Sequence, residues 1–225
     1  MVGTLYNVVM IVVGSVLGAW LKKGLKEAYH TLLMQAMGLV AMGLGINAIV
    51  QHLPKSTFPI LFIVSLAIGS VVGQMLQLEH RFQKGMARFS KGNLAEGLAT
   101  AILLYCIGAL SILGPIEAAL HGDYTYLLAN GTLDGMTSIV LASTFGIGIA
   151  YSAVVVFIWQ GSIFLIALFM KTNVSMTLMN EIQIIGGILI LATGLNILGV
   201  VKIKTMNMLP ALLIPVLFFM LLYLF

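Results

Sequence analysis

Charged side chains are the class of residue that this sequence most clearly lacks. Only 8% of its 225 residues are Asp, Glu, Lys or Arg, whereas 60% are hydrophobic, and the mean hydropathy is +1.10. Soluble domains carry roughly 25% charged residues. A water-facing surface cannot be assembled from this composition, so the sequence indicates an integral membrane protein.

Reactive and metal-binding side chains are also few. Cys106 is the single cysteine, which excludes an intrachain disulfide and a thiolate metal cluster. The four histidines lie far apart, without the spacing of a metal site. No nucleophile–base pair stands out, and Gly146-Ile-Gly148 is too short for a nucleotide-binding fingerprint. We therefore expect no enzyme activity, no cofactor, no metal and no nucleic-acid partner.

The few charges divide the sequence into long uncharged blocks. A spanning helix needs about 20 apolar residues, and all but one of the blocks have the length of a single span. The blocks are 2–21, 31–51, 56–78, 97–116, 135–170, 182–201 and 205–225. We predict an all-α membrane protein, a polytopic bundle of seven or eight transmembrane helices that forms one domain over residues 1–225.

The basic residues favour one orientation in the membrane. Cytoplasmic loops are enriched in Lys and Arg. Lys22, Lys23 and Lys26 follow the first block, and Arg81, Lys84, Arg88 and Lys91 lie in loop 79–96, whereas the loop after the second block holds only Lys55. We therefore expect an N-terminus outside the cytoplasm and a cytoplasmic loop 79–96.

The block 135–170 leaves the number of spans open. It is too long for one straight span and has almost no loop for two. Gly146 and Gly148 lie near its middle, where glycine weakens a helix, so we predict a helix break between Ser143 and Ala150. Two spans here give eight in total; one span with a re-entrant or interfacial segment gives seven. The positive-inside tendency favours eight.

The two ends of the chain are similar to each other at an offset of 149 residues. This shift superposes four identical residues: Lys22 on Lys171, Gly38 on Gly187, Gly45 on Gly194 and Asn47 on Asn196. With eight spans the two glycine-containing helices run in opposite directions, as in inverted-repeat transporters; with seven they are parallel. We expect repeat halves 1–78 and 150–225, joined by 79–149.

Asp134 is the most informative polar residue, because it stands at the edge of the longest uncharged block. A carboxylate near hydrocarbon is costly and normally faces a bundle interior or a water-filled cavity. Aspartate is also a favoured helix N-cap, so we expect a half-helix that starts at Asp134 and breaks near Gly146. With Thr137 and Ser138, Asp134 would form the outer part of a substrate-binding site.

Side-chain amides within the blocks are the second group of candidates. Lipid offers an amide no hydrogen-bond partner, so Asn47, Asn196 and Gln160 would form the deeper part of the site. Bonds that only join helices are the structural alternative for each. Because Asn47 and Asn196 occupy equivalent repeat positions, we expect both to face the interior. Glu181 begins its block beside Gln183 and is expected at the membrane interface.

Pairs of glycines four residues apart occur in the first and third blocks, at Gly14 and Gly18 and at Gly69 and Gly73. This spacing places both glycines on one helix face and lets two backbones approach closely in lipid. We interpret both pairs as packing seams. Self-association of the chain through such faces, to form a homo-oligomer, is a further expectation.

Several short motifs are characteristic in combination: Thr132-Leu-Asp134-Gly135, Phe145-Gly146-Ile-Gly148, Gln160-Gly161-Ser162 and the opening Gly3-Thr-Leu-Tyr-Asn7. With them, the whole chain resembles an uncharacterised bacterial inner-membrane family typified by YqgA and YdfK. It departs from that pattern at Asn130-Gly131, where a Lys-Ser-like pair is expected. The resemblance implies a multi-pass protein of the bacterial inner (cytoplasmic) membrane with seven or eight spans, and it implies no substrate.

Taken together, the residues favour a secondary transporter or channel for a small solute or ion, with its path between the repeat-related helices. The alternative is a non-transporting scaffold or assembly subunit, whose polar residues only join helices. A hydrated site lined by Asp134 and the amides would favour transport, and a dry bundle would favour the scaffold.

Single cysteines test the predicted orientation. In a Cys106→Ala background, Lys55→Cys should react with a membrane-impermeant maleimide in intact cells, because it would lie outside the cytoplasm. Lys84→Cys should react only after lysis. Labelling of Lys84→Cys but not of Lys55→Cys in intact cells would reverse the orientation.

Overall fold

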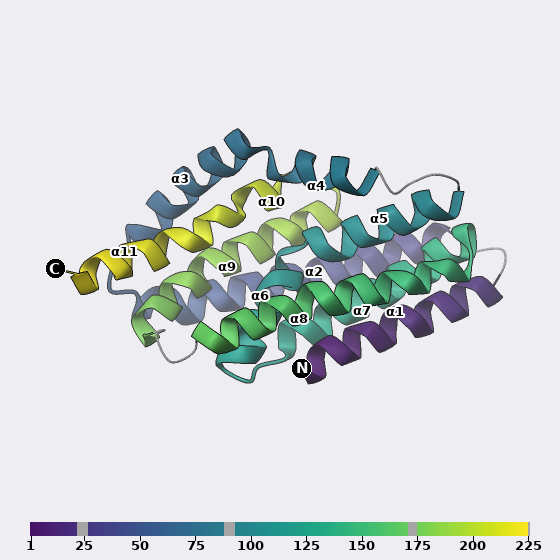
Figure 1. The fold of residues 1–225 in the computed structure, drawn as a ribbon, viewed down its shortest axis with the longest axis horizontal. Helices are drawn as coiled ribbons and strands as arrows, with labels where there is room; N and C mark the ends of the chain where they lie inside the picture. Colours follow the sequence, from purple (N-terminus) through teal and green to yellow (C-terminus); the bar gives the residue numbers. More distant parts are fainter. Residues whose placement is uncertain (22–26, 88–92, 171–174, 225) are drawn as a thin grey trace. The chain divides into compact units, whose positions relative to one another are not determined.

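The computed structural model describes residues 1–21, 27–87, 93–170 and 175–224, and this part of the chain is helical and contains no strand (Figure 1). Several residues used above for the orientation and the repeat lie outside the described residues: Lys22, Lys23, Lys26, Arg88, Lys91 and Lys171. The α-helices are α1 (Val2–Trp20), α2 (Glu27–His52), α3 (Leu61–Leu76), α4 (Leu78–Ala87), α5 (Asn93–Ile107), α6 (Ala109–Leu120), α7 (Thr125–Phe145), α8 (Ser152–Met170), α9 (Met176–Ile197), α10 (Thr205–Met208) and α11 (Leu213–Leu224). Short 3₁₀ segments are η1 (Leu53–Lys55), η2 (Ile147–Tyr151) and η4 (Leu209–Leu212).

Six helical segments of the described chain are long and apolar enough to cross a membrane. They are Val2–Trp20, Met34–Lys55, Leu61–Gly85, Ile147–Phe169, Met176–Ile197 and Thr205–Leu222. The pair α5 and α6 meets the same criteria when taken together, with a bend of 51° between the helices, and would make seven as one broken span. The predicted all-α, polytopic membrane fold is confirmed.

Contacts divide the chain into two compact units, each built from separate stretches of sequence. Unit 1 comprises Met1–Met37 and Arg81–Lys171, and unit 2 comprises Gly38–His80 and Thr172–Phe225. Unit 1 therefore contains α1 and α5 to α8, and unit 2 contains α3 and α9 to α11, while α2 and α4 have residues in both.

In unit 1, α1 and α7 lie side by side and run in the same direction (Figure 1). Gly14 lies against Gly135, and Gly18 lies against Ile139 one turn further along both helices. A Cβ atom on either α1 glycine would overlap a backbone carbonyl of α7. The glycine pair of the first block is thus a packing seam, as predicted, and its partner is a helix of the same chain.

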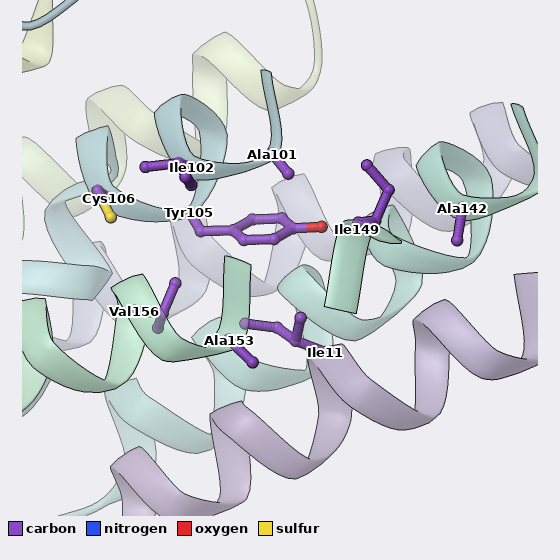
Figure 2. Close-up of a cluster of buried hydrophobic side chains, with 9 residues drawn as sticks. All are labelled: Ile11, Ala101, Ile102, Tyr105, Cys106, Ala142, Ile149, Ala153 and Val156. Carbon is purple, nitrogen blue, oxygen red and sulfur yellow. The ribbon is translucent and has the colours of Figure 1, made fainter. Parts of the chain in front are cut away.

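The apolar core of unit 1 surrounds Tyr105 of α5. Figure 2 shows the Tyr105 ring in the middle of this cluster, with its hydroxyl directed away from Cys106. Cys106 is 1% exposed and packs as a small apolar side chain. The cluster contains residues from α1, α5, α7, η2 and α8: Ile11, Ala101, Ile102, Tyr105, Cys106, Ala142, Ile149, Ala153 and Val156.

Glycines also determine the close approaches within unit 2. The second predicted seam, Gly69 and Gly73 of α3, lies against Ala211 of η4 and Asn207 of α10. Between α2 and α9, a Cβ on Gly45 would lie 2.6 Å from the carbonyl oxygen of Gly187. On the same pair of helices, Gly38 lies against Gly194, so α2 and α9 run antiparallel.

The helix break predicted between Ser143 and Ala150 is confirmed. α7 ends at Phe145, and Gly146 has φ 89° and ψ 177°, a conformation that is essentially restricted to glycine. The predicted helix start at Asp134 is wrong, because α7 begins at Thr125 and Asp134 lies in its interior. In the sequence, an aspartate at the edge of an uncharged block resembles a helix N-cap. In the structure, protein side chains take the place of water as hydrogen-bond donors to this carboxylate.

Alanine substitution tests the α1–α7 seam. Gly14→Ala should destabilise the fold by about 1–3 kcal/mol, the usual cost of inserting volume into a packed interface. Gly43→Ala is the matched control, since a Cβ at Gly43 of α2 has no neighbour within 4 Å. There alanine should be neutral or stabilising, by up to about 1 kcal/mol. Thermal unfolding in detergent measures both, and equal stability of the two variants would contradict the seam.

Candidate functional site

Asp134 lies in the middle of α7 and is 5% exposed. Two amide groups donate to its carboxylate: Asn7 Nδ2 of α1 at 2.9 Å and Asn130 Nδ2, one turn earlier on α7, at 2.8 Å. Both donate to the same oxygen, Oδ2. Among the described residues, neither a hydrogen bond to the second oxygen, Oδ1, nor an ion pair with a basic side chain is present.

The buried face of α1 carries further polar atoms that lack partners. Thr4, Asn7 and Ser15 are each 0% exposed, and Thr4 Oγ1, Asn7 Oδ1 and Ser15 Oγ form no hydrogen bond within the described chain. Their spacing places them on one side of the helix, and Asn7 among them reaches α7 through its hydrogen bond to Asp134. A buried polar atom without a partner costs roughly 1–3 kcal/mol, so three such atoms on one helix face require an explanation.

Ser138 extends the polar face of α7 by one turn beyond Asp134. It is 0% exposed, and its Oγ lies 2.6 Å from the hydroxyl of Tyr105. Thr137, by contrast, is only half-buried and donates to the carbonyl of Leu133 in its own helix. Asp134, Thr137 and Ser138 were predicted to form the outer part of the site. Asp134 and Ser138 lie on one buried face of α7, whereas Thr137 bonds the backbone of its own helix.

Gln160 is also buried in unit 1, on α8. Its Nε2 donates to Ser111 Oγ of α6 at 3.2 Å, and its Oε1 is buried with no partner among the described residues. This amide joins α6 and α8, and none of its hydrogen bonds involves Asp134 or Asn7.

Asn47 and Asn196, predicted to face one interior as a pair, do not do so. Asn47 is exposed and accepts a hydrogen bond from Gln51 on its own helix, at 3.1 Å. Asn196 binds the backbone of Ile203 with both ends of its amide, each at 2.7 Å. The Asn196 amide therefore holds the segment that follows α9. The expectation that Asn47 and Asn196 both face the interior as a pair is wrong.

Glu181 is not at the membrane interface, as the sequence suggested, but is 0% exposed in unit 2. Ser56 Oγ donates to its Oε1 at 2.6 Å, and the backbone N–H of Phe58 donates to the same oxygen at 3.3 Å. Its Oε2 is buried and accepts no hydrogen bond from the part of the chain that the structure describes. Glu181 thereby fastens the segment between η1 and α3 to α9.

Sequence reasoning missed Asn7, Asn130, Thr4, Ser15 and Tyr105. Thr4, Asn7 and Ser15 recur at helical spacing in an otherwise apolar block, and this periodicity is a signal that could have found them. Asn130 stands four residues before Asp134, the spacing of neighbours on a helix face. Nothing in the sequence pairs Tyr105 with Ser138, because this contact depends on how α5 packs on α7.

Comparison with known proteins places the whole chain in one family. The family described as "Protein of unknown function (DUF554)" matches residues 2–220. The "Uncharacterized membrane protein YdfK" of Bacillus subtilis (strain 168) is 65% identical over 215 residues, which cover 96% of this chain and 94% of that protein. The "Uncharacterized protein YqgA" of Escherichia coli (strain K12) is 26% identical, with 95% and 94% covered. No solved structure matches the chain.

A double-mutant cycle tests the bond between the two helices. Asn7→Ala and Asp134→Ala should be coupled by about 0.5–3 kcal/mol, because each removes one partner of the same buried hydrogen bond. Thermal or denaturant unfolding of the two single variants and the double variant measures this coupling. Asn47→Ala is the control and should lie within about 0.5 kcal/mol of the unchanged protein, since Asn47 is exposed. Additive effects of Asn7→Ala and Asp134→Ala would contradict the contact.

Proposed function

We propose that this chain, a membrane protein that belongs to the family described as "Protein of unknown function (DUF554)", is a transporter or channel for a small solute or ion. One observation carries the proposal: a row of buried polar groups runs along α1 and α7, and the two helices are joined where Asn7 donates to the carboxylate of Asp134. Ionisable groups within a membrane are costly and mark solute and ion pathways.

The row of polar groups extends along the membrane-spanning direction of the two helices. From Thr4 to Ser15 it covers eleven residues of α1, or roughly 16 Å at the helical rise per residue. On α7 it includes Asn130, Asp134 and Ser138, each at most 5% exposed. Because lipid cannot supply hydrogen bonds, the unpartnered oxygens on α1 are suited to meet water or a passing solute.

We further propose eight spans, with the N-terminus outside the cytoplasm in the bacterial inner membrane. The six apolar spans and the broken α5–α6 span make seven. α7 would be the additional span that brings the total to eight, because it packs along α1, which is itself long and apolar enough to cross. Parallel α1 and α7 fit the eight-span order, and so do antiparallel α2 and α9. A seven-span order would make α2 and α9 parallel.

An inverted repeat is part of the same proposal. At the predicted offset of 149, Gly38 corresponds to Gly187 and Gly45 to Gly194. The contact of Gly38 with Gly194 therefore corresponds to the contact of Gly187 with Gly45, and both contacts are present. Such reciprocity is expected when two segments are related by a two-fold axis, and inverted repeats of this kind are common in secondary transporters.

A scaffold or assembly subunit is the second candidate. It is favoured by the tightness of the α1–α7 seam, where Gly14 and Gly18 lie directly against the backbone of α7. In that case the polar groups would only join helices, and water would not reach them.

Cysteine accessibility separates the two candidates without knowledge of the substrate. In a Cys106→Ala background, Ser15→Cys and Ser138→Cys should react with 2-aminoethyl methanethiosulfonate in membranes, because a transport path admits a small water-soluble cation. Ala153→Cys, in the apolar cluster of unit 1, and Val13→Cys, on the exposed face of α1, should react at least about ten times more slowly. Equal, slow reaction at all four positions would favour the scaffold and contradict the transport path.

A further inference from the structure

Two uncommitted oxygen atoms belong to side chains that meet at the α1–α7 contact. Asp134 Oδ1 accepts no hydrogen bond within the described chain, since both amides donate to Oδ2. The Nδ2 of Asn7 donates to Asp134, while its Oδ1 is buried and has no partner in the described chain. Both atoms can donate electron pairs to a ligand.

Asp134 also has no partner of opposite charge in the described chain, where its partners are neutral amides. A carboxyl group buried in hydrocarbon is neutralised either by a proton or by a cation that binds it. Amide N–H groups lower the free-energy cost of burying the ionised carboxylate, but they do not neutralise its charge.

We propose that Asp134 and Asn7 bind a small monovalent cation, Na⁺ in the first instance, which the transporter uses as its coupling ion. The inference rests on the proposed transport function and identifies the ion at the same site. A ligand set made only of oxygen suits a hard cation, whereas soft metals prefer sulfur and nitrogen.

The charge balance determines the valence of the ion. One carboxylate and one monovalent cation make a neutral site within the membrane. A divalent cation such as Ca²⁺ would leave a net positive charge there, at the cost that intramembrane charges carry. The neutral Oδ1 of Asn7 would replace part of the hydration shell of the ion, and Asp134 Oδ1 would supply the charge.

Thermal unfolding of the purified full-length protein in a neutral detergent tests the site. NaCl should raise Tm in a saturable manner relative to choline chloride at equal ionic strength, because an ion that binds only the folded state stabilises it. KCl and CaCl₂ should have smaller effects. Asp134→Asn should abolish the Na⁺ response, and Asn7→Ala should raise the apparent Kd for Na⁺ roughly tenfold.

Ser65→Ala is the matched control, because Ser65 Oγ is likewise buried and unpartnered but belongs to unit 2. It should keep the full Na⁺ response. If Asp134→Asn does not fold, Asn7→Ala and isothermal titration of the unchanged protein decide the question. The site is wrong if Na⁺ has no more effect than choline, if Ca²⁺ has a larger one, or if Ser65→Ala loses the response as Asn7→Ala does.

The cysteine labelling described above keeps this inference distinct from the transport proposal. Labelling at Ser15→Cys and Ser138→Cys without any Na⁺ response would support the transport path and contradict the cation site. A Na⁺ response without labelling supports the cation site and contradicts the path.

Discussion

A lipid bilayer provides no hydrogen-bond partners, and this constraint governs the structure around Asp134. A carboxylate in the middle of a helix that packs along a span must receive its donors from the protein. Asn7 and Asn130 supply them, at 2.9 and 2.8 Å. The close approach of α1 to α7, which Gly14 and Gly18 permit, brings Asn7 within reach of the carboxylate. The glycine seam and the polar row are therefore two aspects of one contact.

Each unit contains a buried carboxylate that neutral groups satisfy, but the two serve different ends. Glu181 receives a hydroxyl and a backbone N–H from the segment between η1 and α3, so its bonds fix that segment to α9. Asp134 receives side-chain amides from two parallel helices, and Asn7, one of these donors, has a second atom, Oδ1, without a partner in the described chain. Glu181 also has one oxygen without a partner in the described chain, but its donors belong to the segment that it fastens to α9, and for this reason we assign function to Asp134 rather than to Glu181.

Composition and charge spacing predicted the membrane class, the helical fold and the break at Gly146, because these follow from local hydrophobicity and from the conformational freedom of glycine. Of the residues predicted to form the candidate site, Asp134, Ser138 and Gln160 are buried in the structure. Asn47 and Asn196 were not, because the sequence alone does not show which face of a helix is covered, nor that Asn196 would bind the backbone of Ile203. Asn7 was overlooked, since its role depends on a helix more than a hundred residues away.

The central claim is that Asp134 is a charged ligand for a cation. Infrared difference spectroscopy, with Na⁺ exchanged for choline over the purified protein, observes this carboxylate directly. The account predicts a Na⁺-dependent change in the carboxylate stretching bands that is present in the unchanged protein and absent from Asp134→Asn. Identical spectra in the two salts, or a change that persists in Asp134→Asn, would contradict it.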